Sequence, residues 1–212
     1  MFFRPVTEKD ADFIKKMVDE TWEFNAYSDS TLIKDLILSD YLRSLFNKSN
    51  YSDIAVYNDQ PVGFLFGRCD TISGENLKTL LPFENHNTET IDDTGWNIYL
   101  RDLKKIKDAD DFLIKDKKDL FDGELILFII DGHHRKSGIG RTLLERFMKH
   151  LRENNVKRAY LFTDDYCNFE FYDKIGFHKE NVTSINLSDS NDRKFFLYSF
   201  DNDTNTKSVK RN

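Results

Sequence analysis

Residues 124–142 read ELILFIIDGHHRKSGIGRT, and this stretch decides the expected fold of the chain. Residues 124–130 are apolar apart from Glu124, as in a central strand that helices cover on both faces. From Leu143 to Leu151 the apolar positions recur at helical spacing. A strand that leads through a glycine-containing loop into a helix predicts a site for anionic phosphate. The glycines let backbone N–H groups converge, and the helix start adds partial positive charge.

Two better-known glycine-rich phosphate motifs do not fit this loop. The motif G-x-G-x-x-G, begun at Gly138, needs a glycine at position 143, where Leu143 stands. A P-loop needs Gly-Lys-Ser/Thr after four intervening residues, and the loop lacks it. Because Arg135, Lys136 and Arg141 add cations, we expect a different phosphate-bearing ligand.

Strand and helix patterns alternate over most of the chain. Turn residues and a capping box, Thr7-x-x-Asp10, separate them. The expected strands cover about 2–6, 54–57, 62–67, 124–130, 158–162, 179–187 and 194–200, and the expected helices about 13–22, 31–46, 96–120, 143–151 and 168–175. This alternation predicts an α/β (α+β) fold.

Length and composition favour a single domain with one well-filled core. The chain has 212 residues, with 39% hydrophobic and 32% charged residues. We interpret residues 1–200 as one domain, residues 71–123 as an insertion with too few apolar positions for a core of its own, and residues 201–212 as a flexible tail.

Charge and cysteine usage exclude several classes of protein. A net charge of −6 disfavours a nucleic-acid partner and is compatible with a cationic substrate. Cys69 and Cys167 stand far apart and lack metal-ligand spacing, which indicates reduced, structural thiols and no metal site. The absence of a long apolar run disfavours a membrane partner and predicts a cytoplasmic protein.

Two motifs together resemble those of the GNAT superfamily of acyl-CoA N-acyltransferases. The family's Arg/Gln-x-x-Gly-x-Gly/Ala loop matches Arg135, Gly138 and Gly140, and a second block, Asn-x-x-x-Tyr-x-x-x-Gly-Phe, matches residues 168–177. The strongest resemblance covers residues 124–178. It implies the GNAT fold, which is a central, mixed and mostly antiparallel twisted sheet with helices on both faces.

The resemblance also implies where acetyl-CoA, the expected co-substrate, would bind. The backbone of the strand before the loop would pair with the pantetheine arm, the loop and helix start would hold the diphosphate, and the second block would contact the cofactor arm. Transferred to this chain, the cofactor-binding residues are Phe128, Ile129, Ile130, Arg135, Lys136, Ser137, Gly138, Ile139, Gly140, Arg141, Thr142, Asn168 and Tyr172.

Two residues are candidates for catalysis, since thioester aminolysis needs a base and an acid. Glu124 lies at the register where some family members place a base glutamate; the alternative is a plain carboxylate at a strand start. Tyr172 corresponds to family tyrosines near the CoA sulfur, and a phenol with a pKa of about 10 suits a proton donor; the alternative is a core aromatic. A proton-shuttle role for His133 and His134, and a nucleophile role for Cys167, are weaker alternatives.

The resulting hypothesis is an N-acetyltransferase that moves an acetyl group from acetyl-CoA directly to a primary amine of a small molecule or peptide. The alternative is a non-catalytic acyl-CoA-binding or sensing module. The amine acceptor and a homodimeric state are left open.

Overall fold

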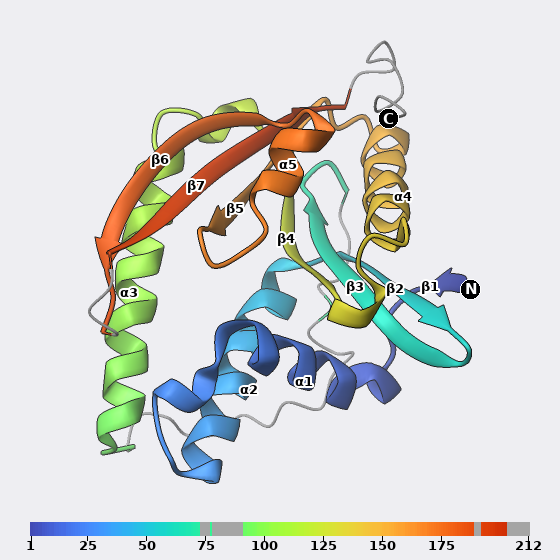
Figure 1. Ribbon diagram of the computed structural model, residues 1–212. Coiled ribbons are helices and arrows are strands. Elements are labelled where there is room, and N and C mark those ends of the chain that lie inside the picture. Colours follow the sequence, from blue (N-terminus) through green and yellow to red (C-terminus); the bar gives the residue numbers. More distant parts are fainter. Residues whose placement is uncertain (73–76, 78–90, 189–191, 203–212) are drawn as a thin grey trace. The chain divides into compact units, whose positions relative to one another are not determined.

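A computed structural model of the chain describes residues 1–72, 77, 91–188 and 192–202. The strands of this described part form a seven-stranded sheet in the order β1-β2-β3-β4-β5-β7-β6 (Figure 1). By its contacts the chain divides into two compact units. Unit 1 comprises Met1–Arg68, Gly74–Leu100 and Ile126–Phe147, and unit 2 comprises Cys69–Ser73, Arg101–Leu125 and Met148–Asn212. The expected mixed, mostly antiparallel α/β fold is confirmed.

Unit 1 begins with three antiparallel strands. β1 (Phe2–Arg4) pairs with β2 (Tyr51–Tyr57), and β2 pairs with β3 (Gln60–Cys69). Asn58 and Asp59 connect β2 and β3 with φ values of 48° and 58°. Two consecutive left-handed residues twist a tight turn in the same sense as the strands, which is why this sequence forms a hairpin.

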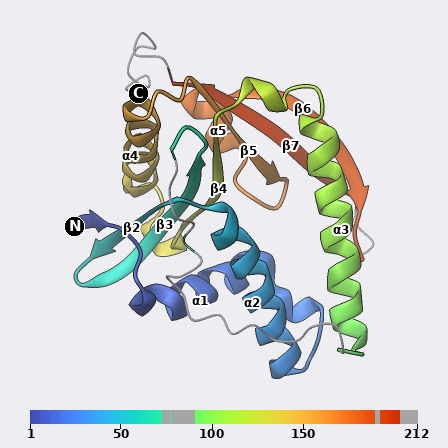
Figure 2. The same ribbon diagram turned by 180° about the vertical axis from the view of Figure 1, so that it is seen from behind.

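The helices of unit 1 pack on both faces of its strands. On one face of β3, Phe64 contacts Phe13 of α1 (Ala11–Trp22), with ring centroids 6.1 Å apart, and Phe66 contacts Phe46 of α2 (Thr31–Lys48) at 4.7 Å. On the other face Gly67 leaves room for Phe147 of α4 (Ile139–Glu153). Figure 2 shows α1 and α2 lying side by side. Successive strand residues alternate between faces, so helices on both faces follow from this sequence.

The predicted capping box forms at the short 3-10 turn Glu8–Asp10, directly before α1. The Thr7 N–H donates to Asp10 Oδ2 over 2.8 Å, and Asp10 also accepts two bonds from the Arg4 guanidinium. The carboxylate thereby satisfies one of the amide donors that a helix start leaves without a partner.

Unit 2 contains the remaining strand pairings. The start of β4 (Gly123–Ile130) pairs in parallel with β5 (Arg158–Asp164), and β7 (Asp192–Asp201) lies antiparallel between β5 and β6 (His178–Asn186). Asn202, after β7, is buried and bonds to the backbone of Lys157 and Val156. Ordered structure therefore extends past the expected start of the tail at residue 201, while residues 203–212 lie outside the described part.

Strand β7 also packs on both faces. On one face Phe195 and Leu197 join Leu113 and Ile114 of α3 (Thr94–Ile114) in a core cluster. On the other face Phe196, Tyr198 and Phe200 contact rings on and around α5 (Glu170–Ile175). The second half of the expected insertion thus supplies part of the core of unit 2. Residues 73–76 and 78–90 of the insertion lie outside the described part.

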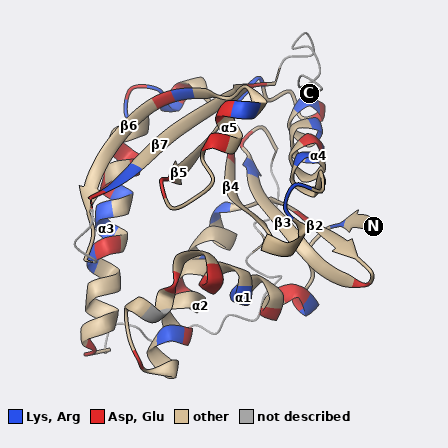
Figure 3. Cartoon of the chain, in the orientation of Figure 1, with Lys and Arg blue, Asp and Glu red and all other residues tan. Residues whose placement is uncertain are grey.

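Side chains of α3 and the segment after it run along strand β6. Lys105 Nζ donates to the Asn186 carbonyl over 2.7 Å, and Asn181 Nδ2 donates to the Leu113 carbonyl over 3.3 Å. Asn181 Oδ1 accepts from the Val182 N–H. The second part of α3 carries both acidic and basic residues, and its first turns carry no charge (Figure 3). Lys105 of α3 therefore satisfies one backbone carbonyl of β6, the edge strand of the sheet.

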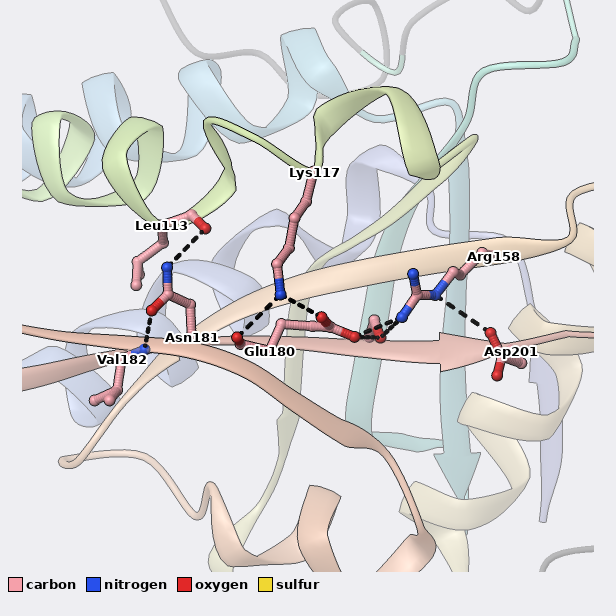
Figure 4. Close-up of polar contacts among 8 residues, drawn as sticks. Leu113, Lys117, Arg158, Glu180, Asn181, Val182 and Asp201 are labelled. Atoms are coloured by element: carbon pink, nitrogen blue, oxygen red, sulfur yellow. Dashed lines mark hydrogen bonds and ion pairs between the residues drawn. The ribbon is translucent and has the colours of Figure 1, made fainter.

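Glu180 lies at the centre of a polar network in the same region (Figure 4). Its carboxylate accepts from Lys117 at 2.6 Å, Arg158 at 2.5 Å and Ser199 at 2.6 Å. Burial opposes ionisation of Glu180, but these hydrogen bonds and the charge of Arg158 outweigh it and hold the pKa of the carboxyl below its usual value.

We expect Glu180→Gln to lower the free energy of unfolding by about 2 kcal/mol at pH 7, because the neutral amide loses charge-assisted hydrogen bonds. A depressed pKa in the folded state stabilises it above the unfolded-chain pKa of about 4.3, and this contribution is lost as the pH falls through the folded value. The difference between variant and wild type should therefore shrink below pH 4 in urea unfolding. Glu153→Gln, which alters an exposed pair with Lys149, serves as the control. A difference that does not change with pH would contradict this account.

Candidate functional site

The loop between β4 and α4 is held by the backbone and side chain of Asp131. Its N–H donates to the Val62 carbonyl over 3.0 Å, and its Oδ1 accepts from the His133 N–H over 2.8 Å. Partial burial opposes ionisation, but this bond and the neighbouring His134 hold the pKa of Asp131 below its usual value. The loop thus leaves β4 through a tight turn at Gly132–His134.

Beyond this turn the chain passes through two left-handed residues, Lys136 with φ of 62° and Gly138 with φ of 87°. Residues 135–138 are exposed. Ser137 Oγ donates to the His134 carbonyl, and Arg135 Nε donates to the Ile130 carbonyl over 3.3 Å. The predicted glycine-containing loop is therefore an exposed bend that carries Lys and Arg side chains (Figure 3).

Helix α4 begins directly after Gly138. The Thr142 N–H donates to the Gly138 carbonyl over 3.0 Å, and the Thr142 hydroxyl donates to the same oxygen over 3.2 Å. The first amides of a helix have no intrahelical acceptor, so the N–H groups of residues 139–141 stand at the positive end of the helix dipole. This is the geometry that a phosphate group requires.

The two glycines of the loop have different functions. A Cβ at Gly138 would meet nothing within 4 Å, so the left-handed backbone is what requires glycine there. A Cβ at Gly140 would lie 3.2 Å from Cζ of Phe128 and 3.4 Å from Cγ1 of Ile130. Gly140 therefore packs closely against side chains of β4, and an added Cβ would require the Phe128 ring to shift slightly. The expectation that both glycines serve to expose amides does not account for this contact.

Burial along β4 alternates as the sequence predicts. Leu125, Leu127 and Ile129 are buried, and Glu124, Ile126, Phe128 and Ile130 are half-buried on the opposite face.

Glu124 lies in unit 2, at the start of β4. It is directly opposite Tyr160 of β5 in the parallel register. The Tyr160 hydroxyl donates to Glu124 Oε2 over 2.9 Å. The carboxylate thus has a defined hydrogen-bond donor, which the sequence did not indicate.

Helix α5 begins at Glu170 rather than at Asn168, so the expectation that Asn168 and Tyr172 share one regular helix is wrong. The Asp164 carboxylate accepts from the N–H groups of Tyr166 and Cys167, and the Phe169 N–H donates to the Cys167 carbonyl. These bonds keep the chain in tight turns up to Phe169. Asn168 is exposed. Gly176 ends the helix with φ of 89°, a left-handed conformation that glycine adopts without strain.

Tyr172 is buried in an aromatic cluster. Its ring lies 5.7 Å from Phe177 and 5.6 Å from Tyr198, and its exposed fraction is 9%. Burial, with smaller effects of Cys167 and Tyr198, raises the pKa of the phenol above its usual value. Tyr172 therefore keeps its proton at neutral pH while it also fills part of the core.

The weaker candidates fit a structural or surface role. Burial and the adjacent Asp164 raise the pKa of the Cys167 thiol to about 12, so it is not a thiolate at neutral pH. His133 is exposed. His134 Nδ1 lies 3.6 Å from Asp131 Oδ1, and its ring contacts Tyr57 edge-on.

A family model described as the acetyltransferase (GNAT) family matches residues 14–177. The chain belongs to the GNAT acetyltransferase family. The predictions of this family and of an acyltransferase are therefore confirmed. A search of curated proteins finds no match.

Several solved structures share the GNAT fold with this chain. An aminoglycoside 6'-N-acetyltransferase complexed with coenzyme A is 16% identical with a TM-score of 0.56, and the match covers 98% of this chain and 100% of that one. The ribosomal-protein-S18-alanine N-acetyltransferase from Escherichia coli is 10% identical with a TM-score of 0.53 and covers 99% of both chains. The putative acetyltransferase yncA from Salmonella typhimurium, solved with acetyl-CoA, is 12% identical with a TM-score of 0.52 and covers 98% of this chain and 97% of that one. At these identities the similarity shows the fold.

In this GNAT acetyltransferase the predicted residues fall into two groups. Residues 128–130 and 135–142 lie in unit 1, and Glu124, Asn168 and Tyr172 lie in unit 2.

Within the described part of the chain, no helix is both long and apolar enough to cross a membrane. The same residues contain no group of three or more His, Cys, Asp or Glu side chains able to hold a metal ion.

Sequence analysis missed two residues with clear positions near the candidate site. Asp131 stands before Gly132 at the end of a strand, a pattern typical of a side chain that accepts from the backbone two residues on. Tyr160 carries no such local signal, because its contact with Glu124 depends on the register between two strands 36 residues apart.

We expect Gly138→Ala to lower the free energy of unfolding by about 1–2 kcal/mol, because an L-residue is strained at a φ of 87°. Gly138→Asn should cost less, since Asn tolerates this conformation better. Urea unfolding measures both effects. Gly132→Ala is the matched control in the same loop: its added methyl group meets nothing within 4 Å and its φ is outside the left-handed region. Equal stabilities of Gly138→Ala and Gly132→Ala would contradict the assignment.

Proposed function

We propose that this GNAT acetyltransferase transfers an acetyl group from acetyl-CoA directly to a primary amine of a small molecule or peptide. One observation carries the proposal. An exposed, cationic bend with a left-handed glycine leads directly into the N-terminus of α4. Family membership supplies the acyl-transfer chemistry, and this bend supplies a place for the diphosphate of the coenzyme.

The loop fits a diphosphate in charge and in backbone geometry. The side chains of Arg135, Lys136 and Arg141 supply positive charge, and the N–H groups of residues 139–141 stand at the helix start. Ser137 and Thr142 carry hydroxyl groups on the same segment. Ile139 is 3% exposed and anchors the first turn of α4. A helix N-terminus with adjacent cations favours a doubly charged ligand.

The remaining coenzyme contacts are assigned to β4 and the segment before α5. Backbone groups of residues 128–130 would pair with the pantetheine arm, although the Ile130 carbonyl already accepts from Arg135 Nε. The exposed amide of Asn168 is proposed as a further contact of the coenzyme. The acetyl thioester, once bound, supplies an activated acyl group.

Tyr172 and Glu124 are proposed as the acid and the base. As the new C–N bond forms and the C–S bond breaks, the amine loses a proton to Glu124, directly or through water. The Tyr172 hydroxyl gives a proton to the departing sulfur. An ordinary phenol is protonated at neutral pH and can donate its proton. Burial raises the pKa of Tyr172, so contact with the departing sulfur has to favour the transfer.

The acceptor is proposed as an amine without further identification. The similar structures include an enzyme named for aminoglycosides and one named for the alanine of a ribosomal protein, two chemically unlike acceptors. The net charge of −6 favours a cationic acceptor. A screen of polyamines, aminoglycosides, lysine-like amines and peptides, monitored by release of free thiol, tests the function. Coenzyme binding without thiol release for any amine would favour the acyl-CoA-binding module instead.

We expect CoA at 100 times its dissociation constant to raise the melting temperature by about 5–10 °C, since ligand binding stabilises the folded state. Lys136→Glu should reduce this shift strongly, because it places negative charge beside the diphosphate. Lys149→Glu alters an exposed position of α4 outside the loop and should keep the shift. A full shift in Lys136→Glu would place the diphosphate elsewhere.

We expect Tyr172→Phe to lower kcat about 100-fold, the magnitude typical of a lost general acid. The phenyl ring keeps its packing, so the melting shift with CoA should remain. Tyr198→Phe is the control, because it removes a buried phenol of the same cluster whose hydroxyl donates to Asp173. An unchanged kcat in Tyr172→Phe would remove the assigned acid and leave Tyr172 as a core residue.

A further inference from the structure

We propose that Tyr160 is a positioning residue, which orients the Glu124 carboxylate for proton removal from the amine. This inference rests on the proposed function and adds a residue to it. It starts from one contact, the 2.9 Å hydrogen bond from the Tyr160 hydroxyl to Glu124 Oε2.

The strand register brings the two side chains together. Glu124 and Tyr160 are direct partners in the parallel pairing of β4 and β5, so both side chains project from the same face of the sheet. Glu124 follows Gly123 at the start of β4 and is only half-buried. A glutamate at such a position has several rotamers within reach, and a fixed donor selects among them.

The Tyr160 ring is held rigidly. It is 7% exposed and contacts Phe121 at 5.1 Å and Phe162 at 5.4 Å between ring centroids. The Arg158 guanidinium lies over the Phe121 ring at 5.2 Å, and Glu180 holds Arg158 in turn. The phenol therefore offers its O–H from a fixed point, as support for a reactive group requires.

The hydrogen bond fixes the position of the carboxylate through its Oε2 atom. As the C–N bond forms, the amine proton moves to Glu124, while Tyr160 keeps its own proton throughout. Tyr160 thus touches neither the amine nor the thioester in this scheme. Its effect reaches the reaction only through Glu124.

A purely structural hydrogen bond would behave differently. Loss of the hydroxyl would then lower the melting temperature and leave kcat unchanged, or it would lower kcat equally with or without Glu124. A positioning role instead predicts a loss of kcat that depends on the presence of the carboxylate. Double-mutant cycles separate these cases.

The test uses the full chain with an amine found in the acceptor screen, and compares wild type, Tyr160→Phe, Glu124→Gln and the double variant. Tyr160→Phe should lower kcat about tenfold with KM for acetyl-CoA unchanged, as expected for loss of one hydrogen bond to a charged group. Glu124→Gln should lower kcat further, and the double variant should be no slower than Glu124→Gln.

Tyr99→Phe is the matched control for removal of a buried phenol. The Tyr99 hydroxyl donates to Asp40 Oδ2 over 3.0 Å, and Tyr99 is 3% exposed. This substitution should leave kcat unchanged. Circular dichroism and thermal melts check that each variant folds.

Three results would overturn the proposal. They are an unchanged kcat in Tyr160→Phe, an unchanged kcat in Glu124→Gln, and effects that multiply in the double variant. A different result would contradict the proposed function: the wild-type protein would bind CoA but release no free thiol with any amine. That result would also end the role assigned to Tyr160.

Discussion

Strands β3 and β7 bury side chains on both faces, and this burial limits where polar side chains can lie. In unit 1, β3 packs Phe64 and Phe66 against α1 and α2 and leaves Gly67 for Phe147 of α4. In unit 2, the two sets of alternating β7 residues pack against α3 and against the α5 region. A strand covered in this way has little room for polar groups along its middle. Glu124 and Asp131 accordingly lie at the two ends of β4, and Asp164 lies at the end of β5.

The loop after β4 shows how one motif combines two physical requirements. Gly138 allows the left-handed backbone that turns the chain into α4, and Gly140 allows that helix to approach Phe128 and Ile130. The conformation of Gly138 sets the shape of the bend. The packing at Gly140 holds the helix that follows the bend against β4. The spacing of two residues between the glycines therefore serves both a turn and a packing contact. The side chains of the exposed cations take part in neither.

Much of the fold could be predicted from the sequence, because strand and helix patterns are local. The hairpin at Asn58 and Asp59, the alternation along β4 and the left-handed Gly176 all depend on neighbouring residues. The regular part of α5 begins at Glu170, two residues after the expected start, and its exact first residue is not encoded in the local pattern. The bond between Tyr160 and Glu124 and the network around Glu180 depend on register and long-range packing. No local pattern encodes such contacts.

The expected insertion contributes more than a surface helix. Leu113 and Ile114 belong to the core cluster of unit 2, and Lys117 holds Glu180. Phe121, which follows, lies between the Arg158 guanidinium and the Tyr160 ring. A continuous set of contacts thus leads from Glu180 through Arg158 and Phe121 to Tyr160 and then to Glu124. Each contact is ordinary packing or pairing, but together they connect the stability of this unit to the orientation of its candidate base. A substitution in the insertion that displaces Phe121 is therefore expected to disturb Tyr160 and leave intact the loop that we propose for the coenzyme.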